Sequence, residues 1–163
     1  MKKTDKFVFF WGADDFMSNF YPKKFYYEGK VMLCSEVAFM LEKALFFNDF
    51  EVAKALVSVK SAKQAKMLGR KVKNYDDSKW EKIRYEKMKK VLSVKFKDNF
   101  LRNSLLSTGD RLLVEASPMD KIWGIGMNEN NIHAENPERW LGQNLLGKAL
   151  MEVRQEIKEE LGM

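Results

Sequence analysis

An apolar stripe with helical spacing follows Cys34 in the chain, and it is formed by Val37, Met40, Leu41 and Ala44. Residues that recur at this spacing bury one face of a helix. We therefore predict a helix that begins after Cys34, behind a short hairpin, and continues to about residue 46.

Two charged residues, Glu36 and Lys43, lie at the border of this apolar face. They are seven residues apart, which is two helical turns, so their side chains project in nearly the same direction, roughly 10 Å apart along the axis. A carboxylate and an amine in this position could line a cleft. They could also be ordinary boundary residues whose stems cover the core, and spacing alone favours this second interpretation because such pairs are common.

The rest of the pattern predicts further helices and a few short strands. Strands are predicted at residues 6–10 and 111–116, and a hairpin at 25–27 and 30–33 around Glu28 and Gly29. Helices are predicted at 49–59, 61–69, 78–97, 98–107 and 144–161, with N-terminal caps at Asp49, at Ser61 with Gln64, and at Ser78 with Glu81. The elements do not alternate as in a doubly wound sheet, so they predict an α+β fold of long helices on a small sheet.

Composition limits the class of protein. A chain of 163 residues, 45% hydrophobic and 32% charged, suits one soluble domain with a core of its own. No apolar run approaches the roughly 20 residues that span a bilayer, and residues 7–11 are too few for a signal peptide. The single cysteine, Cys34, excludes an internal disulfide, and with one histidine, His133, the chain is poor in zinc ligands. We expect a cytoplasmic protein without a metal or membrane partner.

Positive charge is concentrated in the middle of the chain. The net charge is +6, and residues 54–97 contain fifteen Lys and Arg against four Asp and Glu. Such a segment fits a partner that carries phosphate, either a nucleotide or a nucleic acid. A solvated, lysine-rich helical surface explains the count equally well, and the excess of lysine over arginine argues against base-specific recognition.

Two long loops, residues 11–22 and 117–140, are unusual in a compact domain and indicate a functional role. In the second loop Trp123 could stack on a planar base, Gly124 and Gly126 would let the backbone approach a ligand, and Asp120 supplies a second carboxylate. Core packing by the tryptophan and a simple turn at the glycines are equally consistent with the sequence.

Two residues inside predicted helices have packing interpretations. Trp80 is expected to anchor the helix at 78–97 through its hydrophobic ring. Gly147 lies within the last helix, where glycine costs roughly 1 kcal/mol relative to alanine, so close helix packing or ligand approach is implied. The exposed N-terminus of that helix could also receive phosphate.

Elimination leaves chemistry based on carboxylates. The chain has no Ser-His-Asp set and no Gly-Lys-Ser/Thr phosphate loop. Glu36 and Asp120 could flank a scissile glycosidic carbon, where a carboxylate stabilises oxocarbenium-like charge or activates water. This interpretation agrees with the residues, although they do not require it.

An ordered set of motifs resembles the NADAR family, also called the YbiA-like family. The set covers nearly the whole chain and comprises Phe9-Phe10-Trp11-Gly12, Ser18-Asn19-Phe20-Tyr21-Pro22, Cys34-Ser35-Glu36 with Met40 and Lys43-Ala44, residues 68–72, Trp80, Lys95-Phe96, and residues 105–110, 113–117, 120–126 and 140–147 with Leu150-Met151 and Arg154.

The resemblance implies a single domain over residues 1–163, α+β and mainly helical, with long helices around a small antiparallel sheet. It also implies hydrolysis of N-glycosidic bonds by water, without a cofactor. Family members act on phosphoribosylamino-pyrimidine intermediates of riboflavin synthesis, or remove ADP-ribose from guanine in nucleic acid. The implied partners are therefore a phosphoribosyl or ADP-ribosyl substrate, with ADP-ribosylated DNA or RNA among the candidates.

The resemblance also implies site residues by motif position. Glu36 would be the essential carboxylate, Trp80 and Asp120 the other residues associated with activity, and Lys43 would contact substrate or tune Glu36. Weaker candidates for substrate contact are Trp11, Ser18, Asn19, Arg70, Lys95, Trp123, Gly124 and Asn144.

The chain departs from the family pattern next to these residues. The family usually has His or Gln after the glutamate, then an aromatic residue, and Gln before the lysine, where this chain has Val37, Ala38 and Glu42. These departures put the substrate in doubt more than the reaction. Two other functions stay open, a non-catalytic binder of ADP-ribose or nucleotide and a nucleic-acid-binding module that uses residues 54–97.

Overall fold

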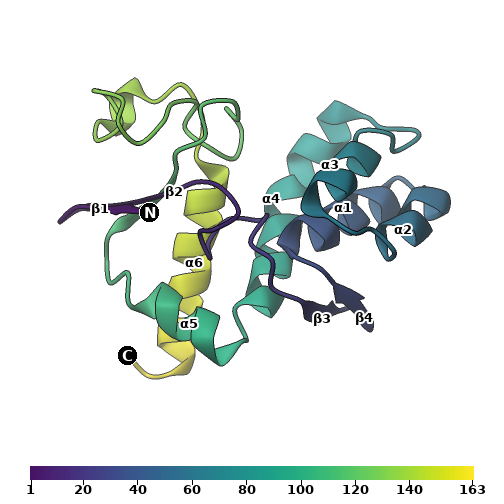
Figure 1. Ribbon diagram of the computed structural model, residues 1–163, viewed down its shortest axis with the longest axis horizontal. Coiled ribbons are helices and arrows are strands. Elements are labelled where there is room, and N and C mark those ends of the chain that lie inside the picture. Colours follow the sequence, from purple (N-terminus) through teal and green to yellow (C-terminus); the bar gives the residue numbers. More distant parts are fainter. The chain divides into compact units, whose positions relative to one another are not determined.

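The computed structural model describes residues 1–163, which form two compact units (Figure 1). One, which we call the terminal unit, comprises Met1–Ser18 and Phe96–Met163. The other, the inserted unit, comprises Asn19–Lys95. The chain thus begins the terminal unit, forms the whole inserted unit and then completes the terminal unit.

The inserted unit is organised around helix α1 (Ser35–Phe46). Strand β4 (Lys30–Met32) and three helices, α2 (Phe50–Leu56), α3 (Ala62–Gly69) and α4 (Asp77–Lys95), all contact α1 (Figure 1). Strands β3 (Phe25–Tyr27) and β4 pair antiparallel through a turn in which Glu28 and Gly29 both have positive φ, as a two-residue hairpin turn requires. Because it is covered on several sides, α1 is buried along most of its length.

The terminal unit contains a three-stranded sheet in the order β1-β2-β5. Strand β1 (Lys2–Lys3) is antiparallel to β2 (Phe7–Phe10), and β2 is parallel to β5 (Leu112–Glu115). Helix α6 (Leu145–Glu160) packs on β5, and α5 (Asn99–Leu106) packs on α6. This sheet is mixed, so the predicted antiparallel pairing describes the β3–β4 hairpin and the β1–β2 pair only.

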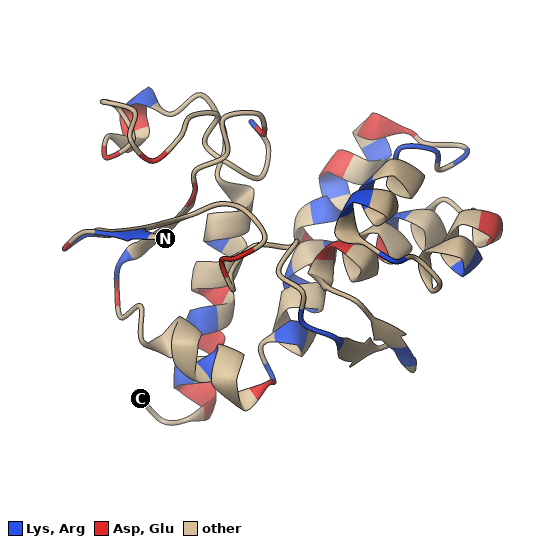
Figure 2. Ribbon diagram, in the orientation of Figure 1, with Lys and Arg blue, Asp and Glu red and all other residues tan.

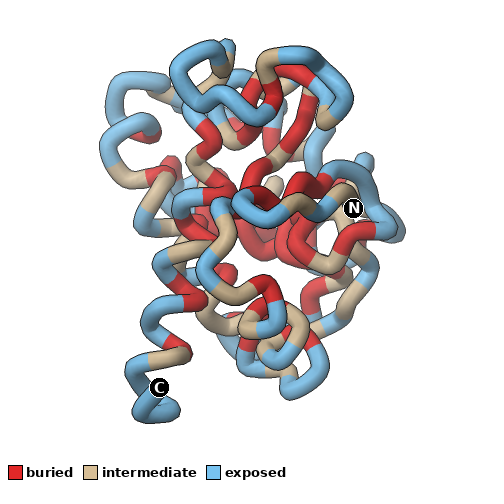
Figure 3. Tube along the Cα trace, turned by 90° about the vertical axis from the view of Figure 1, so that its left-hand side faces the viewer, coloured by how far each residue is buried: buried red, intermediate tan, exposed pale blue.

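The loop at residues 117–140 is part of the core of the terminal unit. Apart from the 3-10 helix η1 (Pro137–Arg139) it has no regular structure, yet it buries side chains against β2 and β5. This core consists of Phe7, Phe9, Val114, Ala116, Ile125, Met127 and Ala134, with Trp140 packed against it. On α6, buried positions recur every three to four residues and end before the exposed C-terminal residues (Figure 3).

The observed helices confirm the α+β, mainly helical prediction, with differences at their ends. Asp49 and Ser61 cap α2 and α3 as predicted. The predicted cap at Ser78 was wrong, because the side chain of Asp76 accepts the hydrogen bonds from the backbone N–H groups of Ser78 and Lys79. Aspartate and serine cap helices equally well, so the sequence did not distinguish them. Helices α2 and α4 also end two to three residues earlier than predicted.

Candidate functional site

Glu36 lies in the first turn of α1, where a network of polar groups fixes the helix start. Its side chain is buried, with 9% exposed, and its backbone N–H donates to the carbonyl of Asn19 at 3.0 Å. Ser35 Oγ donates to Asn19 Oδ1 at 2.8 Å, and Lys95 Nζ donates to Ser35 Oγ at 3.4 Å. A carboxylate in the first turn is also favoured by the helix dipole. Asn19, Ser35 and Lys95 therefore hold the segment that presents Glu36.

Lys43 is half-buried two turns further along α1, with its ammonium over the ring of Tyr75 at 4.5 Å from the centroid. Burial lowers the pKa of Lys43 below its ordinary value, and the negative charge of Glu36 opposes that fall. Arg70 lowers the same pKa and Asp77 raises it. Glu36, Arg70 and Asp77 are therefore electrostatic neighbours of Lys43, in agreement with the direction predicted from the seven-residue spacing.

Trp80 is the hydrophobic anchor of α4, as its place in the sequence predicted. It is buried, and its ring centroid lies 5.5 Å from that of Phe39, 6.1 Å from that of Phe46 and 6.2 Å from that of Phe47. Phe39 and Phe46 each follow Glu36 or Lys43 by three residues. Trp80 thus packs on the same side of α1 that carries the two charged groups.

Lys95, at the end of α4, is an unusual residue because its amine is completely buried. It lies beneath the first turn of α1, where it contacts Ser35, and its ammonium is 6.0 Å from the ring centroid of Tyr21. Burial lowers the pKa of Lys95 to about 7, with a small opposing effect of Cys34. Near neutral pH, this amine therefore changes its charge next to the segment that holds Glu36.

The three departures from the family pattern have packing explanations. Val37 and Ala38 are buried apolar residues of α1. The carboxylate of Glu42 accepts a hydrogen bond from the hydroxyl of Tyr27 at 2.6 Å and forms an ion pair with Lys90 at 3.1 Å. Glu42 thus attaches the hairpin and α4 to α1, which gives this carboxylate a structural role.

In the terminal unit, the carboxylate of Asp120 shapes its own loop. Asp120 Oδ1 accepts hydrogen bonds from the backbone N–H groups of Ile122 at 2.9 Å and Trp123 at 2.8 Å, while the backbone N–H of Asp120 donates to Ser117 Oγ at 3.1 Å. Both backbone bonds use Oδ1, so Oδ2 takes no part in fixing the loop.

Gly124 and Asn144 hold the same loop close to β5 and α6. A Cβ atom at Gly124 would lie 2.9 Å from the carbonyl oxygens of both Asp120 and Glu115, so only glycine fits. The side chain of Asn144 donates to the carbonyl of Leu113 at 3.0 Å and accepts from the N–H of Glu115 at 3.0 Å. Both polar groups of the Asn144 side chain are thus used to fix the start of α6.

The predicted site residues fall into two groups. The inserted unit contains Asn19, Glu36, Lys43, Arg70, Trp80 and Lys95, and the terminal unit contains Trp11, Ser18, Asp120, Trp123, Gly124 and Asn144. In the first group, hydrogen bonds connect Asn19 and Lys95 with Ser35, the residue before Glu36. Electrostatic effects connect Lys43 with Glu36 and Arg70. In the second group, Trp11 is largely exposed, Ser18 is buried and Trp123 is half-buried.

Sequence reasoning missed Arg84, which is buried on the face of α4 between Trp80 and Met88. A charged residue is ordinarily expected on the exposed side of a helix. The apolar neighbour of Arg84, Ile83, is only half-buried. The four-residue spacing between Trp80, Arg84 and Met88 was the signal that could have identified it.

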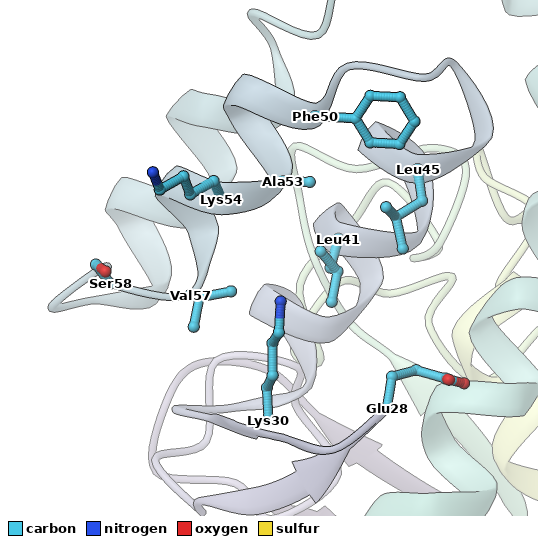
Figure 4. A pocket seen from close by; sticks show the side chains of 9 residues that line it. All are labelled: Glu28, Lys30, Leu41, Leu45, Phe50, Ala53, Lys54, Val57 and Ser58. Atoms are coloured by element: carbon cyan, nitrogen blue, oxygen red, sulfur yellow. The ribbon is translucent and has the colours of Figure 1, made fainter.

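Two surface hollows of the structure are lined without any predicted site residue. The first, of about 440 Å³, is lined by Glu28, Lys30, Leu41, Leu45, Phe50, Ala53, Lys54, Val57 and Ser58 (Figure 4). Leu41 follows Glu36 by five residues, roughly 140° around the helix, so this hollow lies on another side of α1. The second, of about 560 Å³, includes Asp5, Thr108 and Arg111 in the terminal unit.

Neither a cluster of metal-binding side chains nor a helix suited to cross a bilayer is found in the structure. No three His, Cys, Asp or Glu side chains are grouped to hold a metal. None of the helices combines the length and the apolar composition that a membrane span requires.

Comparison with known proteins finds relatives over almost the whole chain. A model of the NADAR domain matches residues 9–158. An N-glycosidase of Acanthamoeba polyphaga mimivirus is 36% identical, over 96% of this chain and 99% of its own length. A riboflavin biosynthesis protein of Vibrio vulnificus is 31% identical over 93% of this chain, which spans 39% of that longer protein. The NMR structure of the Escherichia coli protein YbiA superposes with a TM-score of 0.79 at 29% identity, and covers 98% of this chain and 89% of its own.

Proposed function

Since this chain belongs to the NADAR family and is homologous to N-glycosidases, we propose that it hydrolyses the bond between a phosphorylated ribosyl or ADP-ribosyl group and a base-like amine. The observation that carries this proposal is the buried carboxylate of Glu36. It stands at a helix start that three other residues fix, with Lys43 as an electrostatic neighbour.

The proposed chemistry breaks the bond between C1′ of the ribosyl group and the nitrogen of the base. As this bond lengthens, positive charge develops on C1′ and the ring oxygen. The base leaves with the bonding electrons and gains a proton, which the attacking water supplies in the net reaction. A water oxygen forms the new bond to C1′. The carboxylate of Glu36 stabilises the developing cation or accepts the proton of that water, and either role requires its ionised form.

Lys43 supports this role through its charge. An ammonium near a carboxylate favours the ionised form of the acid, and Glu36 and Lys43 interact electrostatically. The same ammonium can contact a phosphate oxygen of the substrate. Trp80 supports the site through packing, because its ring joins α4 to the face of α1 that carries both charged residues.

The family resemblance also suggests roles for residues of the terminal unit. Oδ2 of Asp120 takes no part in fixing its loop, and we assign this carboxylate an orienting or assisting role. Trp123 is half-buried and Trp11 is exposed, so a ring face of each can be reached by a ligand. Both are therefore candidates for stacking against the leaving base.

Two substrate classes fit the proposal, riboflavin-pathway phosphoribosylamino-pyrimidines and ADP-ribosylated guanine in nucleic acid. The name of the Vibrio relative supports the first class. The inserted unit supports either class, since it contains eighteen Lys and Arg against nine Asp and Glu, and both kinds of substrate carry phosphate.

Product analysis with both substrate classes tests the proposal. The native protein is incubated with ADP-ribosylated guanine DNA, phosphoribosylamino-pyrimidines, NAD and ADP-ribose, and released base and free ribosyl phosphate are measured. We expect release from at least one substrate, and a loss of about 100-fold or more in kcat for Glu36→Gln. Glu42→Gln is the matched control, because Glu42 is also a buried glutamate of α1 but is bound by Tyr27 and Lys90.

Two outcomes would contradict the proposal. Near-native turnover by Glu36→Gln would remove the role of that carboxylate. Tight binding of ADP-ribose, measured by calorimetry, without release of base from any substrate would identify a non-catalytic binding domain instead.

A further inference from the structure

Arg84 is a buried cation whose hydrogen-bonding capacity the protein leaves unused. Its side chain is 7% exposed, and Nε is enclosed without a hydrogen-bond partner. A guanidinium has five N–H donors and keeps its charge inside proteins. Burial of a charged group without a partner costs free energy, so a ligand that brings acceptor oxygens would bind favourably.

Contacts on both sides fix the position of Arg84 along α4. One turn earlier, the ring of Trp80 packs on α1. One turn later, Met88 Sδ accepts a hydrogen bond from Asn19 Nδ2 at 3.6 Å, and the carbonyl of Asn19 accepts the backbone N–H of Glu36. Arg84 therefore lies between two points at which α4 meets the surroundings of α1, next to the turns that carry Glu36.

The surroundings of Arg84 contain charges of both signs. Burial and the hydrogen bond to Asp77 raise the pKa of Tyr75 to about 12, and the charge of Arg84 opposes that rise. Lys43 lies over the same tyrosine ring, and Arg70 acts on Lys43. The Asp77 carboxylate already accepts the Tyr75 hydroxyl at 2.6 Å. Three cations thus share a neighbourhood with three identified anions, Glu36, Asp76 and Asp77.

We propose that Arg84 binds the phosphoryl oxygens of the substrate and so places a phosphorylated ribosyl group beside Glu36. The planar fork of a guanidinium matches two oxygens of a phosphate group, and the fixed place on α4 sets the direction from which the phosphate is held. This assignment rests on the proposed function for its reaction, whereas the binding of a phosphorylated sugar is a separate claim.

Arg154 of α6 shows how the same chain treats a structural arginine. It is also buried, with 6% exposed, but its guanidinium donates to Thr108 Oγ1 at 2.7 Å and to the carbonyl of Arg111 at 2.9 Å. Arg154→Met is therefore the matched control for Arg84→Met, since both changes remove a buried guanidinium from a helix.

Calorimetry with ribose 5-phosphate, ADP-ribose and ribose tests the assignment. We expect Arg84→Met to weaken binding of both phosphorylated probes about 10- to 100-fold, the loss typical of hydrogen bonds to a charged group, and to leave ribose binding unchanged. Arg84→Lys should recover part of the affinity, because charge is kept and the fork is lost. The melting temperature of Arg84→Met should equal or exceed that of the native protein, because an unpaired buried charge has been removed.

Three results would overturn the assignment. The first is equal affinity of the native protein and Arg84→Met for ribose 5-phosphate. The second is a native protein that binds neither phosphorylated probe. The third is a melting temperature that falls as far in Arg84→Met as in Arg154→Met, together with full binding by Arg84→Lys. Failure of the proposed function is distinguishable, because it appears as no base release by the native protein while the phosphate-dependent binding through Arg84 persists.

Discussion

The two units of this protein each bury an arginine in a helix, and they treat it in opposite ways. In the terminal unit, Arg154 is hydrogen-bonded to the side chain of Thr108 and to the backbone of Arg111. In the inserted unit, Arg84 is equally buried but has an enclosed Nε without a partner. The first arrangement stabilises the fold, whereas the second costs stability, which the proposed phosphate ligand would offset.

Two pairs of predicted site residues also differ between the units. In the terminal unit, Asp120 and Asn144 spend their polar atoms largely on backbone groups. In the inserted unit, Glu36 and Lys43 project from the same side of one helix. Charge follows this division (Figure 2), since the inserted unit has eighteen basic and nine acidic residues and the terminal unit has eleven and fourteen. The inserted unit is therefore the better candidate for phosphate recognition.

The largest expected effect on stability comes from removing the hydrogen-bonded arginine. Arg154→Met leaves the hydroxyl of Thr108 and the carbonyl of Arg111 without their donor, and we expect the free energy of unfolding to fall by about 3 kcal/mol. Urea denaturation followed by circular dichroism measures the loss. An equal loss in Arg84→Met would erase the distinction between the two arginines.

Two variants of Asp120 distinguish the effect of its hydrogen bonds to the backbone from the effect of its negative charge. Asparagine can still accept the N–H groups of Ile122 and Trp123 through Oδ1, so Asp120→Asn keeps the loop, whereas Asp120→Ala loses it. We expect kcat to fall about 100-fold in the alanine variant and about tenfold in the asparagine variant. Steady-state kinetics on the best substrate of the panel gives both numbers. Equal losses would assign the whole effect to the negative charge.

The buried amine of Lys95 makes stability depend on pH. Its pKa is about 7 in the folded protein and near its ordinary value of 10.5 when unfolded, so between these values the unfolded state binds the extra proton. The free energy of unfolding therefore rises with pH in this window, by about 2 kcal/mol between pH 7 and pH 9, relative to Lys95→Met. Denaturation of both proteins at the two pH values checks this, and a constant difference would contradict it.

The smallest expected effect compares two glycines in helices. A Cβ atom at Gly147 would overlap the backbone carbonyl oxygen of Leu113, whereas one at Gly69 would meet the flexible side chain of Met40. Alanine has a higher helix propensity than glycine at both sites. The side chain of Met40 can move to make room for the added methyl group, whereas the backbone at Leu113 cannot. We expect Gly147→Ala to lose about 1 kcal/mol and Gly69→Ala to be nearly neutral, as read from thermal melts. Larger damage from Gly69→Ala would reverse this ranking.

Local signals in the sequence were sufficient for most helices. The spacing of Met40 and Leu41 located α1, and Asp49 and Ser61 marked the starts of α2 and α3. The close packing expected at Gly147 is confirmed by its distance from β5.

Features that depend on distant partners could not be predicted in this way. Strand β1 was missed because Lys2 and Lys3 have no strand pattern of their own and are held only by pairing with β2. The parallel pairing of β2 with β5 joins segments that have no sequence relation to each other. Arg84 was missed for a different reason, since its burial contradicts the ordinary preference of a charged residue.

The parallel pairing of β2 with β5 also has a consequence for synthesis of the chain. It matches Phe7 with Leu112, so the ribosome finishes Asn19–Lys95 before the partner strand of β2 exists. Closing a loop of that length in an unfolded chain carries an entropic cost that grows with the number of free residues. If the nascent inserted unit folds first, it shortens the free segment and lowers this cost. The order of translation thus favours folding of the inserted unit, which contains Glu36, before the sheet of the terminal unit forms.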